Sequence, residues 1–533
     1  MLMGIVTIIV LFIPYSKSGI WEGFDIGFHM SRIWGCAEAM KAGIFPVKLH
    51  PVSCFTYGYG VGFFYSNLLI YIPAILVVLG VPLLISYKIF VFLMLLASFL
   101  LVIYCLYSVC HSVLWATLGT VFFMCCKYMT YTLYLSMSLG SLCSFMFTIP
   151  AILGLYRVIV KEESPVMFIL GFVWLLYTHT ITAFLTFIAC FVFCLCFIDR
   201  VLKKKVLMRL VSSVFITLWI SMSHLLPMLE QFKSQVFKVS APWDYAKDHV
   251  LTLSNLTKEW MMGPLTPMVL ILCLIIFLCS YKNISTMSKR GIITFLLISF
   301  GFICITMIQS FWDFCNLTLG IHIIQSPSRL FLIVVALLTC AIACLGENSK
   351  IVYSGFSKKY ILCPLIILFG MYQGYQSFPE AFNKHSSLVD QEILSGEIAG
   401  LGGGEEWLPV EASREKMIEA NQVADNLGEI SFGEKHNHFS TFSFLADFQK
   451  GYYDIPYVYY RGYTARDEGG NRYSIDLASG SGLVRVFMPD NKTGTAKITV
   501  TYEPTKWQLL GYAGSMSCII FLLLFYYWKR RKG

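Results

Sequence analysis

Residues 84–108 read LISYKIFVFLMLLASFLLVIYCLYS, a run with one charged side chain, Lys88. A helix of this length can cross the roughly 30 Å hydrocarbon core of a bilayer. The whole chain has the same character, because 57% of its 533 residues are hydrophobic and only 13% are charged. Soluble domains carry about a quarter charged residues, so the composition predicts a polytopic α-helical membrane protein.

Other apolar stretches predict about twelve crossings plus one interfacial or re-entrant segment, 62–80. Asn67, Pro73 and the tyrosines of that segment suit a membrane interface. The first stretch lacks a basic start and a small-residue cleavage site, so we expect a retained helix rather than a signal peptide. The remaining stretches are 1–17, 112–130, 140–160, 164–178, 180–199, 206–228, 263–280, 290–310, 329–346, 358–375 and 507–528.

Basic clusters set the expected orientation in the cell membrane. Lysines and arginines gather at 200–209, 282–290, 350–359 and 529–532, and the positive-inside rule makes these segments cytoplasmic. Both termini are then cytoplasmic and the loop 18–60 is external. If 62–80 crossed fully, the loop would instead be cytoplasmic and the N-terminus external.

The charge and pattern of the sequence predict three domains. Residues 1–375 form a transmembrane domain, 376–506 an extracytoplasmic domain that is mainly a β-sandwich, and 507–533 the final helix with a basic cytoplasmic tail. The middle domain has 12 Lys and Arg against 19 Asp and Glu and holds none of the 18 cysteines. After a mixed, helical part at 385–427, alternating β-branched and aromatic residues predict an antiparallel sandwich. Its expected strands are 440–448, 456–460, 472–477, 483–488 and 496–503.

The first external loop carries the most informative polar residues. Within GFDIGFHMSRIWG at 23–35, Asp25, His29 and Arg32 are spaced at i, i+4 and i+7 and share one face if the segment is helical. The carboxylate can act as a general base towards an acceptor hydroxyl, and Arg32 or His29 can bind a lipid-linked phosphate. The alternative is an interfacial helix whose polar side chains only pair with one another.

An ordered set of short motifs runs along nearly the whole chain. They are Gly23-x-Asp25 with His29, Gly43-Ile44-Phe45-Pro46, Gly58-Tyr59-Gly60, Phe64-Tyr65, Gln325-Ser326-Pro327-Ser328-Arg329, Gly404-Glu405-Glu406-Trp407-Leu408-Pro409 and Tyr459-Tyr460-Arg461-Gly462-Tyr463. In this order they resemble bacterial YfhO-type membrane proteins of the GT-C glycosyltransferase superfamily.

That resemblance implies transfer of a sugar from a polyprenyl-phosphate donor to an extracytoplasmic cell-envelope polymer or glycolipid, for example in lipoteichoic acid glycosylation. It gives Asp25 the role of catalytic base, with His29 as a neighbour in the site. It also implies that Arg329 grips the carrier phosphate, although an arginine that merely snorkels to the interface would look the same. Glu406 is expected to contact the acceptor sugar or to belong to a structural turn.

Further polar residues lie near the expected external ends of spans. Because placing polar side chains in lipid is costly, we expect such residues to have a function. His179 is the first choice for substrate binding, ahead of His224. Gln309, Trp312 and Asp313 fall at another external turn. These residues either share a cavity with Asp25 or cap helix ends wetted by interfacial water.

One departure from the family pattern bears on catalysis. Relatives tend to carry an arginine and a glutamate in the external turn after the fourth apolar segment, whereas residues 134–141 here have neither charge. A second hypothesis is therefore a non-catalytic carrier or scaffold for lipid-linked glycans or envelope polymers. An ion transporter ranks lower, because ionisable residues concentrate at external ends rather than deep within several spans. We expect no metal, cofactor or nucleic acid, since the sequence lacks their motifs.

Overall fold

The computed structural model describes residues 2–240, 245–256, 258, 261–322, 324–348, 362–383, 404–413, 417 and 421–532. The chain folds as two compact units, each assembled from three separated stretches. Unit 1 comprises Met1–Phe24, Lys88–Leu218 and Pro242–Leu388. Unit 2 comprises Asp25–Tyr87, Trp219–Ala241 and Val389–Gly533.

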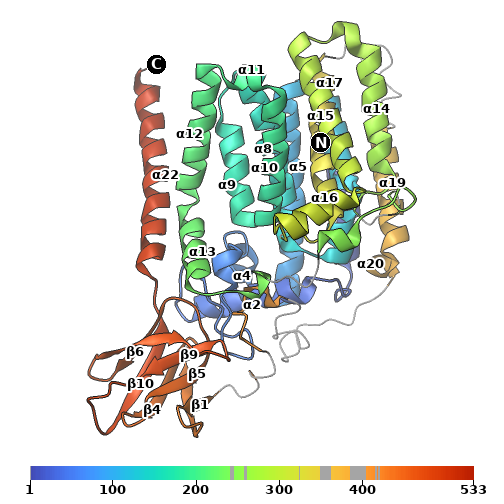
Figure 1. Cartoon of the computed structure of the whole chain (residues 1–533). Helices are drawn as coiled ribbons and strands as arrows, with labels where there is room; N and C mark the ends of the chain where they lie inside the picture. Colours follow the sequence, from blue (N-terminus) through green and yellow to red (C-terminus); the bar gives the residue numbers. More distant parts are fainter. Residues whose placement is uncertain are drawn as a thin grey trace. The chain divides into compact units, whose positions relative to one another are not determined.

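Unit 1 is built of helices, which Figure 1 shows from blue to yellow. Most of its α-helices follow the apolar stretches of the sequence. They are α1 (Leu2–Phe12), α5 (Leu83–Cys110, which begins in unit 2), α6 (Val113–Cys125), α7 (Lys127–Tyr131), α8 (Leu139–Ile159), α9 (Val166–Thr178), α10 (Thr180–Cys196), α11 (Ile198–Val201), α12 (Lys204–Ile220), α14 (Leu265–Ser280), α15 (Thr286–Ile305), α16 (Gln309–Asp313), α17 (Phe331–Asn348), α19 (Leu362–Ser377) and α20 (Pro379–Asn383). Short helical turns include η1 (Ile13–Ser16), η2 (Thr132–Ser136), η4 (Ala246–His249), η5 (Tyr281–Asn283), η6 (Phe314–Thr318) and η7 (Pro327–Leu330).

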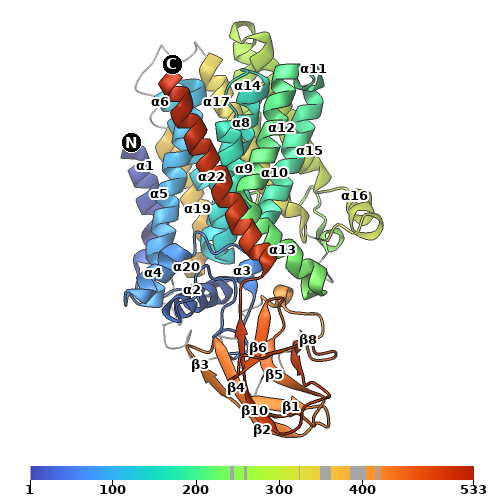
Figure 2. The same ribbon diagram turned by 90° about the vertical axis from the view of Figure 1, so that its left-hand side faces the viewer.

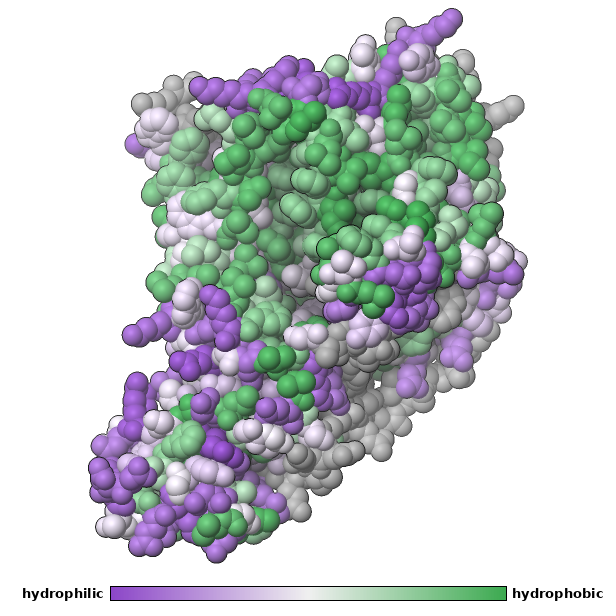
Figure 3. Space-filling view, in the orientation of Figure 1, coloured by the Kyte–Doolittle hydropathy of each residue, from purple (hydrophilic) through white to green (hydrophobic). Residues whose placement is uncertain are grey.

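The chain is a multi-pass membrane protein. Among the described residues, seven helical segments are long and apolar enough to cross a bilayer, or eight if a bent pair counts as one span. The apolar helices Leu2–Ser16, Val166–Thr178 and Thr180–Cys196 are shorter. The twelve crossings therefore remain a prediction. Figure 3 shows the hydrophobic surface over the helices of unit 1 and the hydrophilic residues at the end where α11 lies.

Small residues let α8 and α9 pack closely in unit 1. A Cβ added to Gly154 of α8 would lie 2.4 Å from the Phe168 backbone nitrogen, and one added to Gly171 of α9 would lie 2.4 Å from the Ala151 nitrogen. Such reciprocal contacts bring two backbones together where the hydrophobic effect does little to drive association, because lipid is also apolar. The surrounding window of α8 is 94% buried, so α8 is an interior helix of unit 1.

The expected single helix at 206–228 is wrong. The chain forms α12 up to Ile220 and a separate helix, α13 (Met222–Ser234), with the break at Ser221. Pro227 lies inside α13 and has no N–H to offer the carbonyl of Ser223 four residues earlier. Lys48 supplies a donor instead, with its Nζ 3.4 Å from that carbonyl oxygen. Hydropathy alone does not register this break.

Residues 62–80 do not form one long helix. They contain α3 (Val61–Phe64) and α4 (Tyr71–Val78), joined by a link that includes Asn67. At about 1.5 Å per residue, the eight residues of α4 extend only about 12 Å. Neither helix is long enough to cross the bilayer by itself.

Unit 2 contains two five-stranded antiparallel sheets. Their strand orders are β2-β1-β5-β9-β8 and β3-β4-β10-β6-β7. The expected part at 385–427 lies largely outside the described residues, and its described end is a strand, β1, which pairs with β5. The strands are β1 (Gln422–Asp425), β2 (Ile430–Phe432), β3 (Glu434–His436), β4 (Thr441–Asp447), β5 (Tyr452–Val458), β6 (Tyr463–Asp467), β7 (Arg472–Tyr473), β8 (Ile475–Leu477), β9 (Leu483–Phe487) and β10 (Thr495–Tyr502).

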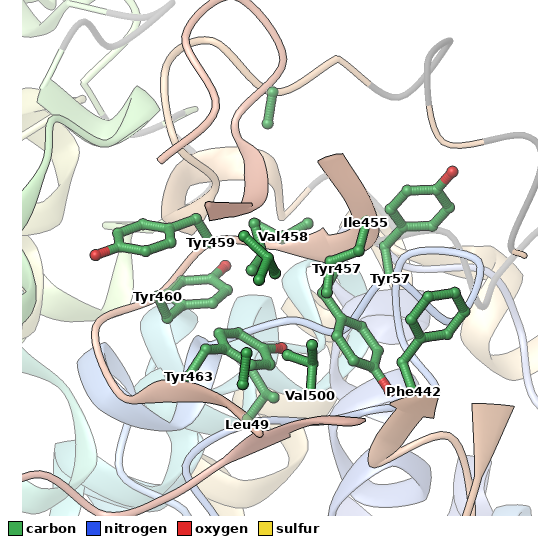
Figure 4. Close-up of a cluster of buried hydrophobic side chains, with 14 of the residues drawn as sticks. Leu49, Tyr57, Phe442, Ile455, Tyr457, Val458, Tyr459, Tyr460, Tyr463 and Val500 are labelled. Atoms are coloured by element: carbon green, nitrogen blue, oxygen red, sulfur yellow. The ribbon is translucent and has the colours of Figure 1, made fainter. Parts of the chain in front are cut away.

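The first loop completes the core between these sheets. Buried side chains of residues 49–64 belong to the same hydrophobic cluster as those of β4, β5, β9 and β10. Figure 4 shows Leu49 and Tyr57 among Phe442, Tyr457 and Val500. The backbone joins in, since the Val458 N–H donates to the Tyr57 carbonyl at 2.8 Å. Two segments about 400 positions apart in the sequence therefore fold as one body.

Helices complete unit 2. They are α2 (Ile26–Lys41), α3, α4, α13, the turns η3 (Lys238–Ser240) and η9 (Glu405–Trp407), and α22 (Lys506–Lys532). Figure 2 shows α22 continuing from β10 as one long helix. It packs against α13, where an added Cβ at Gly511 would lie 2.7 Å from the Met222 carbonyl oxygen. Most other side chains of α22 are exposed and apolar, as expected of a helix facing lipid.

Candidate functional site

Helix α2 presents the three polar residues expected from the first loop. Asp25 is the N-cap residue, and its carbonyl oxygen accepts from the His29 backbone N–H at 3.0 Å. Ten of the sixteen residues of α2 are buried. His29 and Arg32 are 2% and 3% exposed, so their helix face is covered by protein rather than water.

Arg32 connects α2 to the link between α3 and α4. Its Nη2 lies 3.3 Å from the Ser66 carbonyl oxygen and 3.3 Å from Asn67 Oδ1. The guanidinium also sits over the rings of Phe28 and Tyr65, at 5.7 and 5.1 Å. Arg32 therefore holds the segment between α3 and α4 in place and adds a buried positive charge to α2.

Asn67 continues the polar chain to His50. The Asn67 Nδ2 lies 3.0 Å from His50 Nε2 and 3.2 Å from the Val47 carbonyl oxygen. Burial lowers the pKa of His50 to about 3, and the charge of Arg32 adds to this effect. The imidazole is therefore neutral at physiological pH, with Nε2 accepting from Asn67. Gly35 of α2 makes room for it, because an added Cβ would lie 2.8 Å from His50 Cβ.

Lys48 is a second buried cation in the same segment. Besides the Ser223 carbonyl, its Nζ has the imidazole of His224 as an electrostatic neighbour, and His224 is itself 1% exposed. Burial lowers the pKa of Lys48 to about 8. Within the described residues Lys48 forms no ion pair. The positive charge of Lys48 is therefore not neutralised by any carboxylate of the described residues.

Glu406 lies in a turn anchored on both sides. Tyr59 Oη donates to the Gly404 carbonyl, and Tyr460 Oη donates to the Trp407 carbonyl at 2.9 Å. The Trp407 ring stacks on Phe64 with a centroid distance of 4.5 Å. These contacts favour the structural-turn interpretation of Glu406, while its contact with a sugar stays a prediction.

His179 and Arg329 both belong to unit 1. His179 joins α9 to α10, and its Nδ1 lies 2.8 Å from Thr182 Oγ1, which also accepts from Ser144 Oγ at 3.0 Å. Arg329 lies in η7 just before α17, and its Nη2 donates to Gln325 Oε1. Its Nη1 is buried and has no hydrogen-bond partner among the described residues. That nitrogen is suited to an oxygen ligand.

The other suspected residues of unit 1 have hydrogen-bond partners close to them in the sequence. Gln309 Nε2 lies 3.0 Å from Asp313 Oδ1, and Trp312 Nε1 donates to the Ile305 carbonyl at 2.9 Å. These bonds fit the interpretation of a capped helix end. The cavity expected to join them to Asp25 stays a prediction, because Asp25 belongs to unit 2.

Sequence reasoning missed Lys48 and His50, and also Lys127 in unit 1. Lys127 is buried within the candidate span Val113–Ser136. Its Nζ lies 3.3 Å from the Gln373 carbonyl oxygen and 4.9 Å from the centre of the Phe378 ring. The signal was present, because a lysine inside an apolar stretch is costly and warrants a functional explanation.

Asp25 heads α2, His29 and Arg32 are buried on that helix, and the Arg32–Asn67–His50 chain joins it to the segment that carries Lys48. A carboxylate at the head of the helix can accept a proton, and the cations Arg32 and Lys48 can attract an anion. The described residues contain no group of three or more His, Cys, Asp or Glu able to hold a metal ion.

No protein-family model matches the chain, and no curated protein sequence matches it. Among solved structures, the cryo-EM structure of the arabinofuranosyltransferase AftD from mycobacteria is similar, with a TM-score of 0.41 and 11% identity. The match covers 71% of this chain and 26% of that chain, so this chain matches about a quarter of AftD. At this TM-score and identity the likeness assigns no function.

Proposed function

We propose that the protein is a GT-C-like membrane glycosyltransferase. It transfers a sugar from a polyprenyl-phosphate donor to a cell-envelope polymer or glycolipid outside the membrane. Both termini are cytoplasmic in this proposal, and α2 lies at the external surface. The observation that carries the proposal is the start of α2, where Asp25 heads a helix whose next two turns bury His29 and Arg32.

The reaction is a direct displacement at the anomeric carbon of the donor. The acceptor hydroxyl oxygen forms the new bond to that carbon while the bond to the phosphate oxygen breaks. Asp25 takes the hydroxyl proton as general base. The departing polyprenyl phosphate carries the leaving electron pair, and Arg32, on the helix that Asp25 caps, stabilises its charge.

The lack of charged residues in segment 134–141 favours a second candidate function, a non-catalytic carrier or scaffold. The segment contains the end of η2 and the start of α8 rather than an exposed charged turn. A carrier or scaffold that presents lipid-linked glycans needs no group there to hold a donor phosphate. This alternative predicts that glycan binding survives without turnover.

The decisive variant is Asp25→Asn, which removes the basic oxygen with little change in shape. We expect normal protein abundance but the same envelope glycan composition as in a deletion strain, measured by mass spectrometry of released glycans. Glu22→Gln is the matched control, because Glu22 is an exposed carboxylate three positions earlier. Unchanged glycosylation in a normally produced Asp25→Asn protein would defeat the proposal.

Labelling tests the required orientation. Phe45 in the first loop is 72% exposed and Lys203 is exposed before α12. A membrane-impermeant maleimide added to intact cells should label Phe45→Cys and spare Lys203→Cys, after subtraction of the signal from the native cysteines. The reverse pattern would place the proposed base in the cytoplasm, where no external acceptor can reach it.

A further inference from the structure

Unit 2 contains a cleft of about 880 Å³ whose lining includes none of the residues given a role in the proposed transfer. It lies between α13, the strands β6 to β8, and the segment where β10 passes into α22. We call it the α13–α22 cleft. Its charged and aromatic lining includes Lys233, Arg461, Arg472, Asp476, Lys506 and Trp507.

The backbone beneath Arg461 is held firmly. The buried Gln231 donates from Nε2 to the Arg461 carbonyl at 2.9 Å and accepts the Arg461 N–H at Oε1, also at 2.9 Å. Gly462 follows with φ +134°, and an added Cβ there would lie 2.6 Å from the Tyr502 ring. Arg461 therefore presents an exposed guanidinium on a fixed backbone, which lowers the entropy lost when it binds a ligand.

The cleft has more available positive than negative charge. Its four cations, Lys233, Arg461, Arg472 and Lys506, form no ion pair within the described residues. Of its three carboxylates, Glu503 is paired with Arg466, whose Nη2 lies 2.6 Å away. Glu230 accepts from Thr505 Oγ1 at 2.5 Å and interacts electrostatically with Arg461, so Glu230 and Asp476 face four cations.

The cleft also offers groups suited to sugar hydroxyls. Asp476 and the hydroxyls of Ser234 and Thr464 line it, and Trp507 is 50% exposed at the first turn of α22. Carboxylates accept from hydroxyl groups, while an exposed indole provides a flat apolar surface for a sugar ring. The volume falls within the usual range for organic ligands and exceeds what a single anion fills.

We propose that the α13–α22 cleft binds an anionic saccharide, with its phosphate or carboxylate groups on Arg461 and the neighbouring cations. α22 is a candidate span that begins at Lys506, so the cleft opens where a surface-bound envelope glycan would pass. The proposal names the acceptor class of the proposed transferase and rests on that function for its biological role. Binding itself requires no turnover.

The test uses the purified full-length chain in neutral-lipid nanodiscs. Titrations with trigalacturonate and with phosphorylated maltotriose are compared with neutral maltotriose and inorganic phosphate. We expect the two anionic trisaccharides to bind, and Arg461→Ala to weaken their binding about tenfold through loss of a charge-assisted contact. Lys497→Ala is the control, because Lys497 is an exposed cation of β10 outside the cleft, and it should leave binding unchanged.

Three outcomes would overturn the proposal. They are absence of binding, equal weakening by Arg461→Ala and Lys497→Ala, and displacement of the sugars by phosphatidylglycerol vesicles in an Arg461-dependent manner, which would indicate a lipid headgroup site. Binding by inorganic phosphate alone would likewise reject a saccharide. Asp25→Asn separates the two proposals, because it should abolish transfer while leaving trisaccharide binding intact.

Discussion

Lys435 provides a stability prediction whose sign follows from its surroundings. It lies on β3, and its Nζ donates to the carbonyl oxygen and the hydroxyl of Thr56 in the first loop. The ammonium also lies 5.0 Å from the centre of the Tyr57 ring and 5.2 Å from that of Tyr457. Burial lowers the pKa of Lys435 from 10.5 to about 7.

This pKa makes the charged lysine a cost to folding. Below pH 7, Lys435 is protonated in both states and the cost is constant. Between pH 7 and 10.5, the unfolded chain holds a proton that the folded chain has released, so stability rises with pH. At 1.36 kcal/mol per pH unit, the full cost below pH 7 is at most about 5 kcal/mol, falling to about 2 kcal/mol at pH 9.

Lys435→Met removes this titration. Relative to the parent, the variant should be stabilised most at pH 6, and the advantage should shrink by about 3 kcal/mol by pH 9. The assay is denaturant unfolding of the detergent-solubilised chain between pH 6 and 9, followed by fluorescence. Lys497→Met serves as an exposed control. A stability difference that is the same at both ends of this range would refute the reasoning.

Three further substitutions test packing. Phe64→Ala removes a buried ring from the core shared by the first loop and the sheets and should cost about 3–5 kcal/mol; unchanged protease resistance of the β-domain would contradict this. Pro227→Ala restores a backbone donor to the Ser223 carbonyl, so Lys48→Met should destabilise the protein less in that background. In a double-mutant cycle, a coupling energy below about 0.5 kcal/mol would argue against the hydrogen bond from Lys48 to that carbonyl. Gly171→Leu places a side chain 2.4 Å from the Ala151 nitrogen and should lower the melting temperature of the solubilised protein, whereas Gly171 is dispensable if it does not.

Most membrane helices were predictable because hydrophobicity is a local property of the sequence. The break at Ser221 was not, because the groups that bond to the backbone beside it, Lys48 at the Ser223 carbonyl and Ser515 at the Ser223 N–H, are 175 and 292 positions away in the sequence. The short helices within 62–80 were partly foreseen, because Asn67 and Pro73 interrupt an otherwise apolar stretch.

The candidate site was predictable only where spacing carried the information. Asp25, His29 and Arg32 share a helix face by their separation alone. The burial of Lys48 and His50 comes from tertiary packing, and a short polar run in a loop gives no periodicity from which to infer it. The functional roles of all five residues remain predictions.

Alternation predicted β4, β9, β10 and part of β5, whereas the expected strand 472–477 divides into β7 and β8 of different sheets, and β1, β2, β3 and β6 were not expected. The domain boundary expected at 376 does not indicate which residues fill the core of the sandwich. Residues 49–64 contribute side chains to both sheets, and nothing in the period of the strands indicates that partner. A pattern along one segment reports which face is buried and not which distant segment covers it.

The shared core also bears on how the proposed base and the α13–α22 cleft would act together. Gly60 lies against Tyr460, where an added Cβ would be 2.5 Å from the ring, and Tyr460 is followed directly by Arg461. Arg461 and the loop that follows α2 are thus packed within one unit. A glycan held at Arg461 would have less freedom relative to Asp25, which lowers the entropy cost of the transfer. Gly60→Ala should separate these elements slightly and lower kcat/KM for a polymeric acceptor several-fold. A free monosaccharide acceptor, which does not rely on binding in the cleft, should be affected less. Equal losses for both acceptors would mean that the cleft and α2 act independently.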